Sequence, residues 1–221
     1  MEFFYSDSNG HHQENPRFLR KAEKAIKHAQ RQIYKKEKGK NNRRKARLRC
    51  AKKHLRVNRQ RNEHALRLAR CVCKANALVA YENLNVKGMV KNHRLAKSIN
   101  DVAWSLFRRW LEYFAQKFKT NIVPVHPHHT SQICSNCGVI VKKTLSTRTH
   151  ACKCGCVLQR DVNAAKNILD RAKLNRDGQS RINATGLATN TLVGESLLEQ
   201  VTRKNVESPG FTSKRAAAMF S

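Results

Sequence analysis

Five of the eight cysteines lie within 23 residues, at spacings that suit a metal ion. Cys134 and Cys137 form a C-x-x-C pair, Cys152 and Cys154 form a C-x-C pair, and Cys156 follows two residues later. Zn²⁺ takes four thiolate or imidazole ligands in a tetrahedron, and two close pairs on two turns supply them. We therefore predict a zinc ribbon in which Cys134, Cys137, Cys152 and Cys154 hold one Zn²⁺.

The second cysteine pair leaves the fourth ligand open. C-x-C is a tight spacing, so either Cys154 or Cys156 can complete the set, and His150 is a weaker substitute. Gly138 and Gly155 follow the two pairs, where a chain that turns its amides towards the sulfurs often needs a positive φ. The competing interpretation is a group of unrelated buried thiols or a disulfide.

Two carboxylates stand where a second site can form. Glu82 follows the apolar run 77–81, which is typical of a strand covered on both faces, and ligand sites gather at the carboxyl ends of such strands. Asp161 stands at the start of a helical pattern, where an N-cap is the ordinary structural role. Each residue alone also fits these structural roles. His126, His128 and His129 are a third candidate group, although such clusters are more often polar loops.

The charge of the chain points to a polyanionic partner. Lys and Arg number 45 against 15 Asp and Glu, which gives a net charge of +30 and a pI near 10.5. Nucleic acid is the expected partner of such a chain, with a membrane surface as the alternative. The sequence has no run of about 18 apolar residues and no signal peptide, and we expect no membrane or small-molecule partner. Metal-spaced cysteines favour a reducing cytoplasm.

The basic residues concentrate in one stretch. Apolar periodicity predicts helices from Pro16 to Ile33 and from Arg43 to Cys73, with Leu48 and Leu55 on the packed side of the second. Such a pair reads as an antiparallel helical hairpin over residues 17–75. From residue 35 to 62 there are fourteen Lys or Arg and one acid. We expect this stretch to contact phosphates through Arg43, Arg44, Lys45, Arg47, Lys52 and Lys53.

The remaining elements indicate an α/β protein. A β-hairpin is predicted at 3–14, a helix at 94–118 and an edge strand at 122–125, where Pro124 disfavours a central position. Residues 174–221 are poor in large apolar side chains, which predicts a mostly disordered tail.

Three motifs together resemble the TnpB family, the transposon-encoded proteins of the OrfB transposase type. These are YENLNVKGM at 81–89, TSQICSNCG at 130–138 and CGCVLQRDVNAAKNIL at 154–169, with NPRFLRKAEK at 15–24 as a fourth stretch. The resemblance covers residues 1 to about 170. It implies a RuvC-like nuclease core of the RNase H type, an inserted zinc ribbon, and RNA-guided cleavage of DNA with a guide RNA as partner.

The resemblance also assigns residues and domains. Glu82 matches the second catalytic carboxylate of the family and Asp161 the third, so Mg²⁺ is the implied catalytic cofactor beside the ribbon Zn²⁺. The implied layout is a partial core with the basic hairpin at 1–125, a ribbon that binds target nucleic acid at 126–160, a final core helix at 161–173 and the tail. The expected location is the prokaryotic cytoplasm, in association with the nucleoid.

One family motif has no counterpart in the sequence. The first carboxylate of the family stands in a G-[IV]-D-x-G motif, and the chain contains no such motif, while Asp7 lies in a turn and is a poor substitute. We therefore expect an N-terminally truncated, nuclease-deficient TnpB-like protein that binds DNA and RNA. The alternatives are a non-catalytic basic zinc-ribbon binder and a degenerate transposon remnant.

Overall fold

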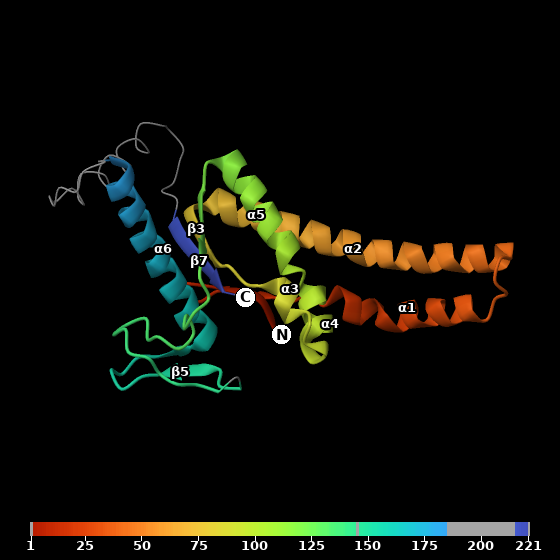
Figure 1. The fold of residues 1–221 in the computed structure, drawn as a ribbon, viewed down its shortest axis with the longest axis horizontal. Coiled ribbons are helices and arrows are strands. Elements are labelled where there is room, and N and C mark those ends of the chain that lie inside the picture. Colours follow the sequence, from red (N-terminus) through yellow and green to blue (C-terminus); the bar gives the residue numbers. More distant parts are fainter. Residues whose placement is uncertain (1, 145, 185–214, 221) are drawn as a thin grey trace.

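The computed structural model describes residues 2–144, 146–184 and 215–220. Five strands form one mixed sheet (Figure 1) with the order β2-β1-β7-β3-β4. Their bounds are β1 (Phe3–Asp7), β2 (His12–Glu14), β3 (Asn76–Glu82), β4 (Asn121–Val125) and β7 (Arg215–Phe220). The pair β1 and β2 is the predicted N-terminal hairpin. In the turn between them, Asp7 Oδ1 accepts hydrogen bonds from the backbone amides of Asn9 and His11.

Strand β3 is covered on both faces, as its uninterrupted apolar sequence predicts. Val79 packs in the core that α2 (Asn41–Ala75) and α5 (Trp104–Phe118) build on one face, whereas the next residue, Ala80, packs against α6 (Arg160–Ala184) on the other. Alternating side chains of a strand point to opposite faces, so neighbours can serve two cores. Strand β4 runs parallel to β3 and stands at the sheet edge, which confirms the prediction from Pro124.

Helices α1 (Phe18–Tyr34) and α2 (Asn41–Ala75) lie side by side and extend away from the sheet (Figure 1). We call the two helices and the turn between them, residues 18–75, the hairpin arm. The predicted packing of Leu48 and Leu55 is wrong, because these side chains are 53% and 45% exposed. Ala46, Cys50 and Val57 are buried instead. Their small side chains let the two helices approach closely, which the size of a leucine does not reveal.

A single carboxylate fastens the base of the hairpin arm. Asp101 is 5% exposed, and its oxygens accept from the backbone amides of Leu19 at 2.9 Å and Arg20 at 3.3 Å. Arg61 of α2 donates to the same carboxylate at 2.8 Å. These amides begin α1, where helical donors have no partner within the helix, and the N-cap residue Arg17 supplies no side-chain cap. Asp101 therefore caps α1 from another helix.

The helix predicted at 94–118 is two helices. Strand β3 is followed by the short α3 (Val86–Met89), then α4 (His93–Val102) and α5 (Trp104–Phe118). The break falls at Ala103, whose φ of 59° is left-handed. Beyond it, Trp104 donates from Nε1 to the carbonyl of Phe4 at 3.1 Å, so α5 turns onto the sheet. Apolar periodicity continues across the break, which is why the sequence does not show it.

The last described elements are β5 (Thr149–Ala151), β6 (Val157–Gln159) and α6 (Arg160–Ala184). The sequence predicted the final helix at 161–173 and a mostly disordered tail after it. Helix α6 continues past the predicted end, to Ala184, and β7, which belongs to the predicted tail, joins the sheet between β1 and β3. Residues 185–214 of the predicted tail lie outside the described residues. Within the described part of the chain, none of the helices combines the length and apolarity needed to cross a membrane.

Candidate functional site

The four predicted cysteines come together. The ligand atoms of Cys134, Cys137, Cys152 and Cys154 all lie within 4.8 Å of one another, and this group can hold a metal ion. The Sγ atoms of Cys134 and Cys154 are 3.7 Å apart, and those of Cys137 and Cys152 are 3.6 Å apart. A tetrahedron with metal–sulfur bonds of about 2.3 Å has edges of about 3.8 Å. The spacing of the sulfurs therefore fits a tetrahedral thiolate site.

Two tight turns present these cysteines. Gly138 donates its amide to the carbonyl of Cys134, and Gly155 donates to the carbonyl of Cys152. Both glycines have positive φ, 76° and 85°, as predicted, so a side chain at either position would strain the turn. The antiparallel pair β5 and β6 flanks the second turn.

Of the alternative ligands, Cys154 belongs to the four-sulfur group, whereas Cys156 and His150 do not. His150 is buried on β5, and its Nδ1 contacts the Lys143 amine. The Cys134 thiol is already disposed to ionise. Burial opposes its thiolate, but hydrogen bonds from the backbone amides of Cys137 and Asn136 and from the side chains of His150 and Cys137 together lower the pKa of Cys134.

Two buried asparagines of α6 hold the first cysteine turn. Asn163 is fully buried, donates to the carbonyl of Ile133 at 2.7 Å and accepts from the amide of Ser135 at 3.0 Å. Asn167, one helical turn later, donates to the carbonyls of Thr130 at 2.8 Å and Ile133 at 2.7 Å. The cysteine turn is thus fixed to the helix that also carries Asp161.

Glu82 ends β3 and is 8% exposed. Its Oε1 accepts a hydrogen bond of 2.8 Å from the hydroxyl of Thr130, which is 2% exposed. Burial raises the pKa of Glu82 to about 7. The Thr130 hydrogen bond and the charge of Arg171 lower this pKa, and the charge of Asp161 raises it. Glu82 therefore changes its charge near neutral pH, and a cation beside it would favour the charged form.

Asp161 lies in the first turn of α6 rather than at the predicted N-cap. Its side chain is 17% exposed, and Arg160 donates to it at 3.2 Å. Glu82 and Asp161 are 79 positions apart in the sequence. The fold brings the end of β3 and the start of α6 near enough for the charge of Asp161 to act on Glu82.

The histidine group forms a polar loop. His126, His128 and His129 follow β4, and none belongs to the metal-ligand group found among the described residues. The guanidinium of Arg171 donates to the backbone carbonyls of His126 at 3.2 Å and His128 at 2.8 Å. The loop thereby holds Arg171 close to Glu82.

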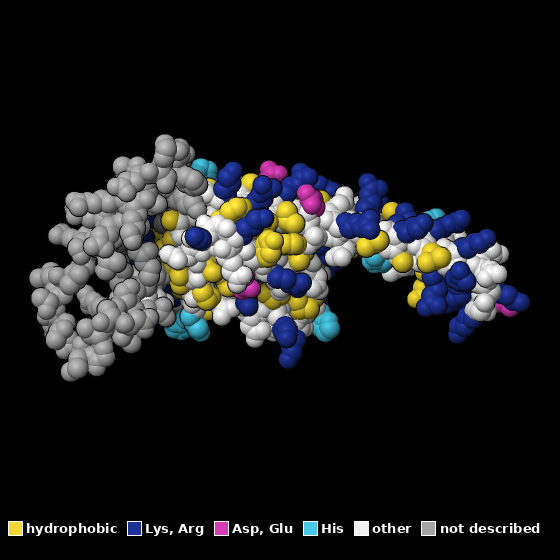
Figure 2. Space-filling model, turned by 90° about the horizontal axis from the view of Figure 1, so that it is seen from above, with side chains coloured by type: hydrophobic (Ala, Val, Ile, Leu, Met, Phe, Trp, Pro, Cys, Tyr) yellow, Lys and Arg dark blue, Asp and Glu magenta, His cyan; other side chains and the backbone are white. Residues whose placement is uncertain are grey.

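The basic residues predicted to contact phosphates all lie on α2. Lys and Arg side chains crowd the hairpin arm, where few acids interrupt them (Figure 2). Arg43 is half-buried and donates to the carbonyl of Lys36 at 2.9 Å, so it also fastens the turn of the arm. The other five are exposed: Arg44, Lys45, Arg47, Lys52 and Lys53.

Sequence reasoning missed the residues that connect the two candidate metal sites. Thr130, Asn163 and Asn167 carry no charge and offer no metal-ligand pattern, so no rule for catalytic groups selects them. A signal was present in the motifs TSQICSNCG and RDVNAAKNIL, since two asparagines four residues apart lie on one face of a helix.

Most of the described chain matches known protein families. Residues 2–93 match a family model described as "Probable transposase", and residues 104–168 match one described as "Cas12f1-like, TNB domain". A "Putative RNA-guided DNA endonuclease" of Streptomyces pristinaespiralis is 36% identical over 164 residues, which cover 73% of this chain and 41% of that protein.

Two further proteins are similar. "Putative RNA-guided DNA endonuclease InsQ" of Escherichia coli (strain K12) is 30% identical over 168 residues, which cover 68% of this chain and 42% of that protein. This chain thus spans about two fifths of the length of both relatives. A solved structure titled "Cryo-EM structure of the Cas12f1-sgRNA-target DNA complex" shares the fold, with a TM-score of 0.50 and 19% identity over 72% of this chain and 43% of that one.

Proposed function

We propose, from the premise that this chain belongs to the TnpB family of transposon-encoded proteins, that it binds DNA and a guide RNA as a part of an RNA-guided DNA endonuclease. In this proposal the five-stranded sheet with α2, α5 and α6 is a RuvC-like core. The hairpin arm contacts the nucleic-acid backbone, and residues 126–160, which we call the cysteine lobe, are a zinc ribbon that contacts target nucleic acid. The proposed place of action is the cytoplasm, at the nucleoid.

The observation that carries the proposal is the charge of the hairpin arm. Fourteen Lys or Arg and one acid occupy residues 35–62, and most of these side chains are exposed. Like charges this close repel one another, and a purely structural helix would mix both signs. A polyanion relieves the repulsion because each neutralised phosphate releases a condensed counterion.

Fluorescence anisotropy with a labelled 20-nucleotide RNA, the same DNA strand and its duplex tests the binding. The dissociation constant should rise steeply with salt. A plot of the logarithm of the association constant against the logarithm of the salt concentration should be linear, with a negative slope of about 0.9 for each phosphate contacted on duplex DNA. Replacing Arg44, Lys45, Arg47 and Lys52 by Gln should flatten this dependence, by about one unit of slope for each phosphate that the variant no longer neutralises.

A matched control removes the same charge elsewhere. Lys87, Lys91, Arg109 and Lys117 are exposed and lie outside the hairpin arm. Their replacement by Gln should leave the salt dependence close to that of the unchanged protein. Equal effects of both sets would show that only net charge matters and would refute a phosphate-contacting arm.

Glu82 and Asp161 fit a divalent cation that also contacts phosphate. Mg²⁺ is usually held by one or two carboxylates, with waters and substrate phosphates as its other ligands. Glu82 offers a buried carboxylate with an unusually high pKa beside a second acid, which is the condition that a cation relieves. When bound, Mg²⁺ would supply stabilisation of the charge that develops on the phosphodiester oxygens. Thr130 would orient the Glu82 carboxylate, and Arg171 would limit the negative charge around it.

A second candidate function is nucleic-acid binding without cleavage. It is favoured because the four cysteines are the only group of three or more candidate ligands among the described residues, so no third carboxylate joins Glu82 and Asp161 there. A supercoiled plasmid incubated with this chain, RNA co-purified from the expressing cells and Mg²⁺ distinguishes the two. Cleavage that Glu82→Ala abolishes supports the nuclease, whereas tight salt-sensitive binding without cleavage supports the binder.

For the cysteine lobe we propose one Zn²⁺ with a structural role. All four ligand positions are taken by cysteines, which is typical of closed structural sites, whereas catalytic zinc sites keep one position open. The lobe buries few large side chains, so metal binding would contribute much of its folding free energy.

A further inference from the structure

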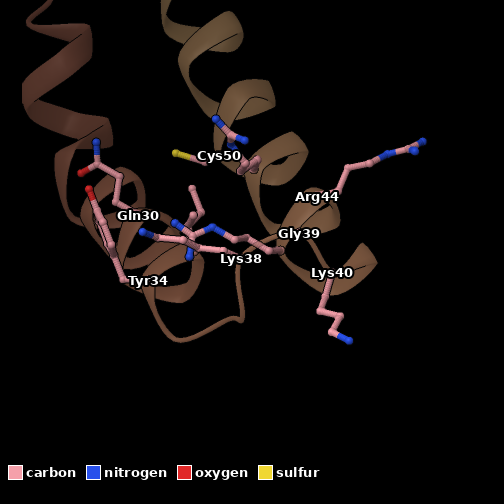
Figure 3. Close-up of a pocket in the computed structure, with 10 residues that line it drawn as sticks. Gln30, Tyr34, Lys38, Gly39, Lys40, Arg44 and Cys50 are labelled. Atoms are coloured by element: carbon pink, nitrogen blue, oxygen red, sulfur yellow. The ribbon is translucent and has the colours of Figure 1, made fainter.

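The free end of the hairpin arm contains a cleft. An aromatic side chain and several Lys and Arg side chains line it. It lies between the end of α1 and the start of α2, and its volume is about 730 Å³ (Figure 3). Pockets that hold small organic ligands usually measure about 300–1,000 Å³, so the cleft has room for a nucleotide. Figure 3 shows Tyr34 and Gln30 on the α1 side and Cys50 on the α2 side, with Lys38 between them.

The cleft is strongly cationic. Five of its ten lining residues are Lys or Arg and none is Asp or Glu. The first turn of α2, which also faces the turn of the arm, carries no acidic residue, and its N-cap Lys40 provides no side-chain cap. Amides at a helix start and surrounding cations favour an anion together. Arg44 and Lys40 extend outward from the cleft (Figure 3), where they can contact the chain of a ligand on either side.

Tyr34 gives the cleft a different chemistry from the rest of the arm. It is the last residue of α1, and its side chain is 80% exposed. Within the described residues it makes none of the ring contacts that the other exposed tyrosine, Tyr113, makes with Trp110 and Phe114. An aromatic ring left in water beside cations is the arrangement that single-stranded nucleic-acid sites use, with the base stacked on the ring and the phosphates held by the cations.

We propose that this cleft binds one unpaired nucleotide of a nucleic acid, with its base stacked on Tyr34 and its phosphate held by Lys38, Arg43 and Arg47. The inference rests on the proposed nucleic-acid binding and adds a preference to it. Bases within a duplex are stacked on each other and do not present a face to a side chain at the surface. The exposed arginines of α2 would contact paired and unpaired strands alike, whereas the cleft would select an unpaired position.

Four labelled probes test this selection by anisotropy at a fixed salt concentration. They are a 20-nucleotide single-stranded RNA, its DNA equivalent, a 20-base-pair RNA duplex, and the same duplex with one unpaired adenosine. Tyr34→Ala should weaken binding of both single strands and of the bulged duplex by about tenfold, within the range of base stacking on an aromatic ring. It should change binding of the fully paired duplex by less than twofold.

Two matched variants separate the ring from other properties of Tyr34. Tyr34→Phe keeps the ring and should retain the preference for unpaired probes. Leu48→Ala removes another exposed apolar side chain of the same arm and should affect all four probes equally or not at all. As a direct readout, 2-aminopurine placed at the bulge should lose fluorescence on binding to the unchanged protein and keep it on binding to Tyr34→Ala.

The possible outcomes distinguish failure of nucleic-acid binding from failure of the preference for an unpaired base. If the unchanged protein binds no probe in a salt-dependent manner, the proposed nucleic-acid binding itself fails. If it binds all probes but Tyr34→Ala weakens them equally, or weakens none, the cleft does not select an unpaired base and this inference is overturned. A larger loss for single-stranded RNA than for DNA would identify RNA as the source of the nucleotide, and equal losses would show that the cleft reads base and phosphate alone.

Discussion

Replacing Thr130 by Val should raise the pKa of Glu82 further. In the structure the Thr130 hydroxyl donates to Glu82 Oε1 at 2.8 Å, and both residues are buried. Valine has nearly the same shape but no donor. A hydrogen bond to a charged group contributes about 1.5–3 kcal/mol. Since one pH unit in a pKa corresponds to about 1.36 kcal/mol, the pKa of Glu82 should rise by about one to two pH units.

This increase moves the pKa of Glu82 to a value above neutral pH. Its pKa is about 7 in the unchanged protein, so the carboxylate is mostly ionised at pH 7.5. In Thr130→Val it should be mostly protonated at that pH, and a cation must then displace the proton. The affinity for Mn²⁺, used as a probe for Mg²⁺, should fall by roughly tenfold at pH 7.5. The affinities of the two proteins should converge near pH 9.5, where Glu82 is ionised in both.

Carbon-13 NMR of protein labelled at the glutamate side chains gives the pKa directly, with Glu82→Gln used to assign the signal. Electron paramagnetic resonance of free Mn²⁺ gives the affinity at each pH. Thr130→Ser keeps the hydroxyl and should behave as the unchanged protein. An unaltered Glu82 pKa in a folded Thr130→Val protein would refute the reasoning.

Three further outcomes are expected. Burial raises the pKa of Glu82 from 4.5 to about 7 in the folded protein, so the folded state binds this proton more tightly than the unfolded state. The free energy of unfolding should therefore fall by about 3 kcal/mol as the pH rises from 4.5 to about 7. Glu82→Gln should remove this fall, and urea unfolding at pH 8 without Mg²⁺ should show a more stable variant. Cys154→Ser should lose zinc while Cys156→Ser retains one equivalent, as measured by mass spectrometry of the metal; the reverse pattern would exclude the proposed ligand set. Asp101→Ala should lower the free energy of unfolding by about 3–5 kcal/mol, because it leaves the Arg61 charge and two helix amides without their buried partner; a loss below 1 kcal/mol in urea unfolding would contradict this role.

The cysteine lobe was predictable because its signal is local. Two close pairs of cysteines, each followed by a glycine, indicate the two turns and three of the ligands, whatever the rest of the chain does. The choice between Cys154 and Cys156 was not predictable, since it depends on how the second turn meets the first. The strands β3 and β4 were equally readable, because uninterrupted apolar residues and Pro124 report directly on burial and on the sheet edge.

The failures of sequence reasoning concern how elements meet. Leu48 and Leu55 follow the helical period, yet the partner helix lies against the smaller residues Ala46, Cys50 and Val57. The break at Ala103 interrupts no periodic pattern. The pairing of β7 with β1 and β3 joins it to segments about 210 and about 140 residues earlier in the sequence, and nothing local in an alanine-rich segment indicates such partners. Thr130 is a similar case, because its importance derives from contact with a strand 48 positions away.

Asp101 caps α1 at the base of the hairpin arm, and this base is the pivot for any tilt of the helix. The 17 residues of α1 span about 25 Å, at about 1.5 Å per residue. A tilt of about 10° at the pivot would therefore displace the far end by about 4 Å. Successive nucleotides of one strand in a duplex are spaced about 3.4 Å along the axis. If the arm contacts a duplex as proposed, a tilt of this size at its base would shift the contact at the tip by about one nucleotide.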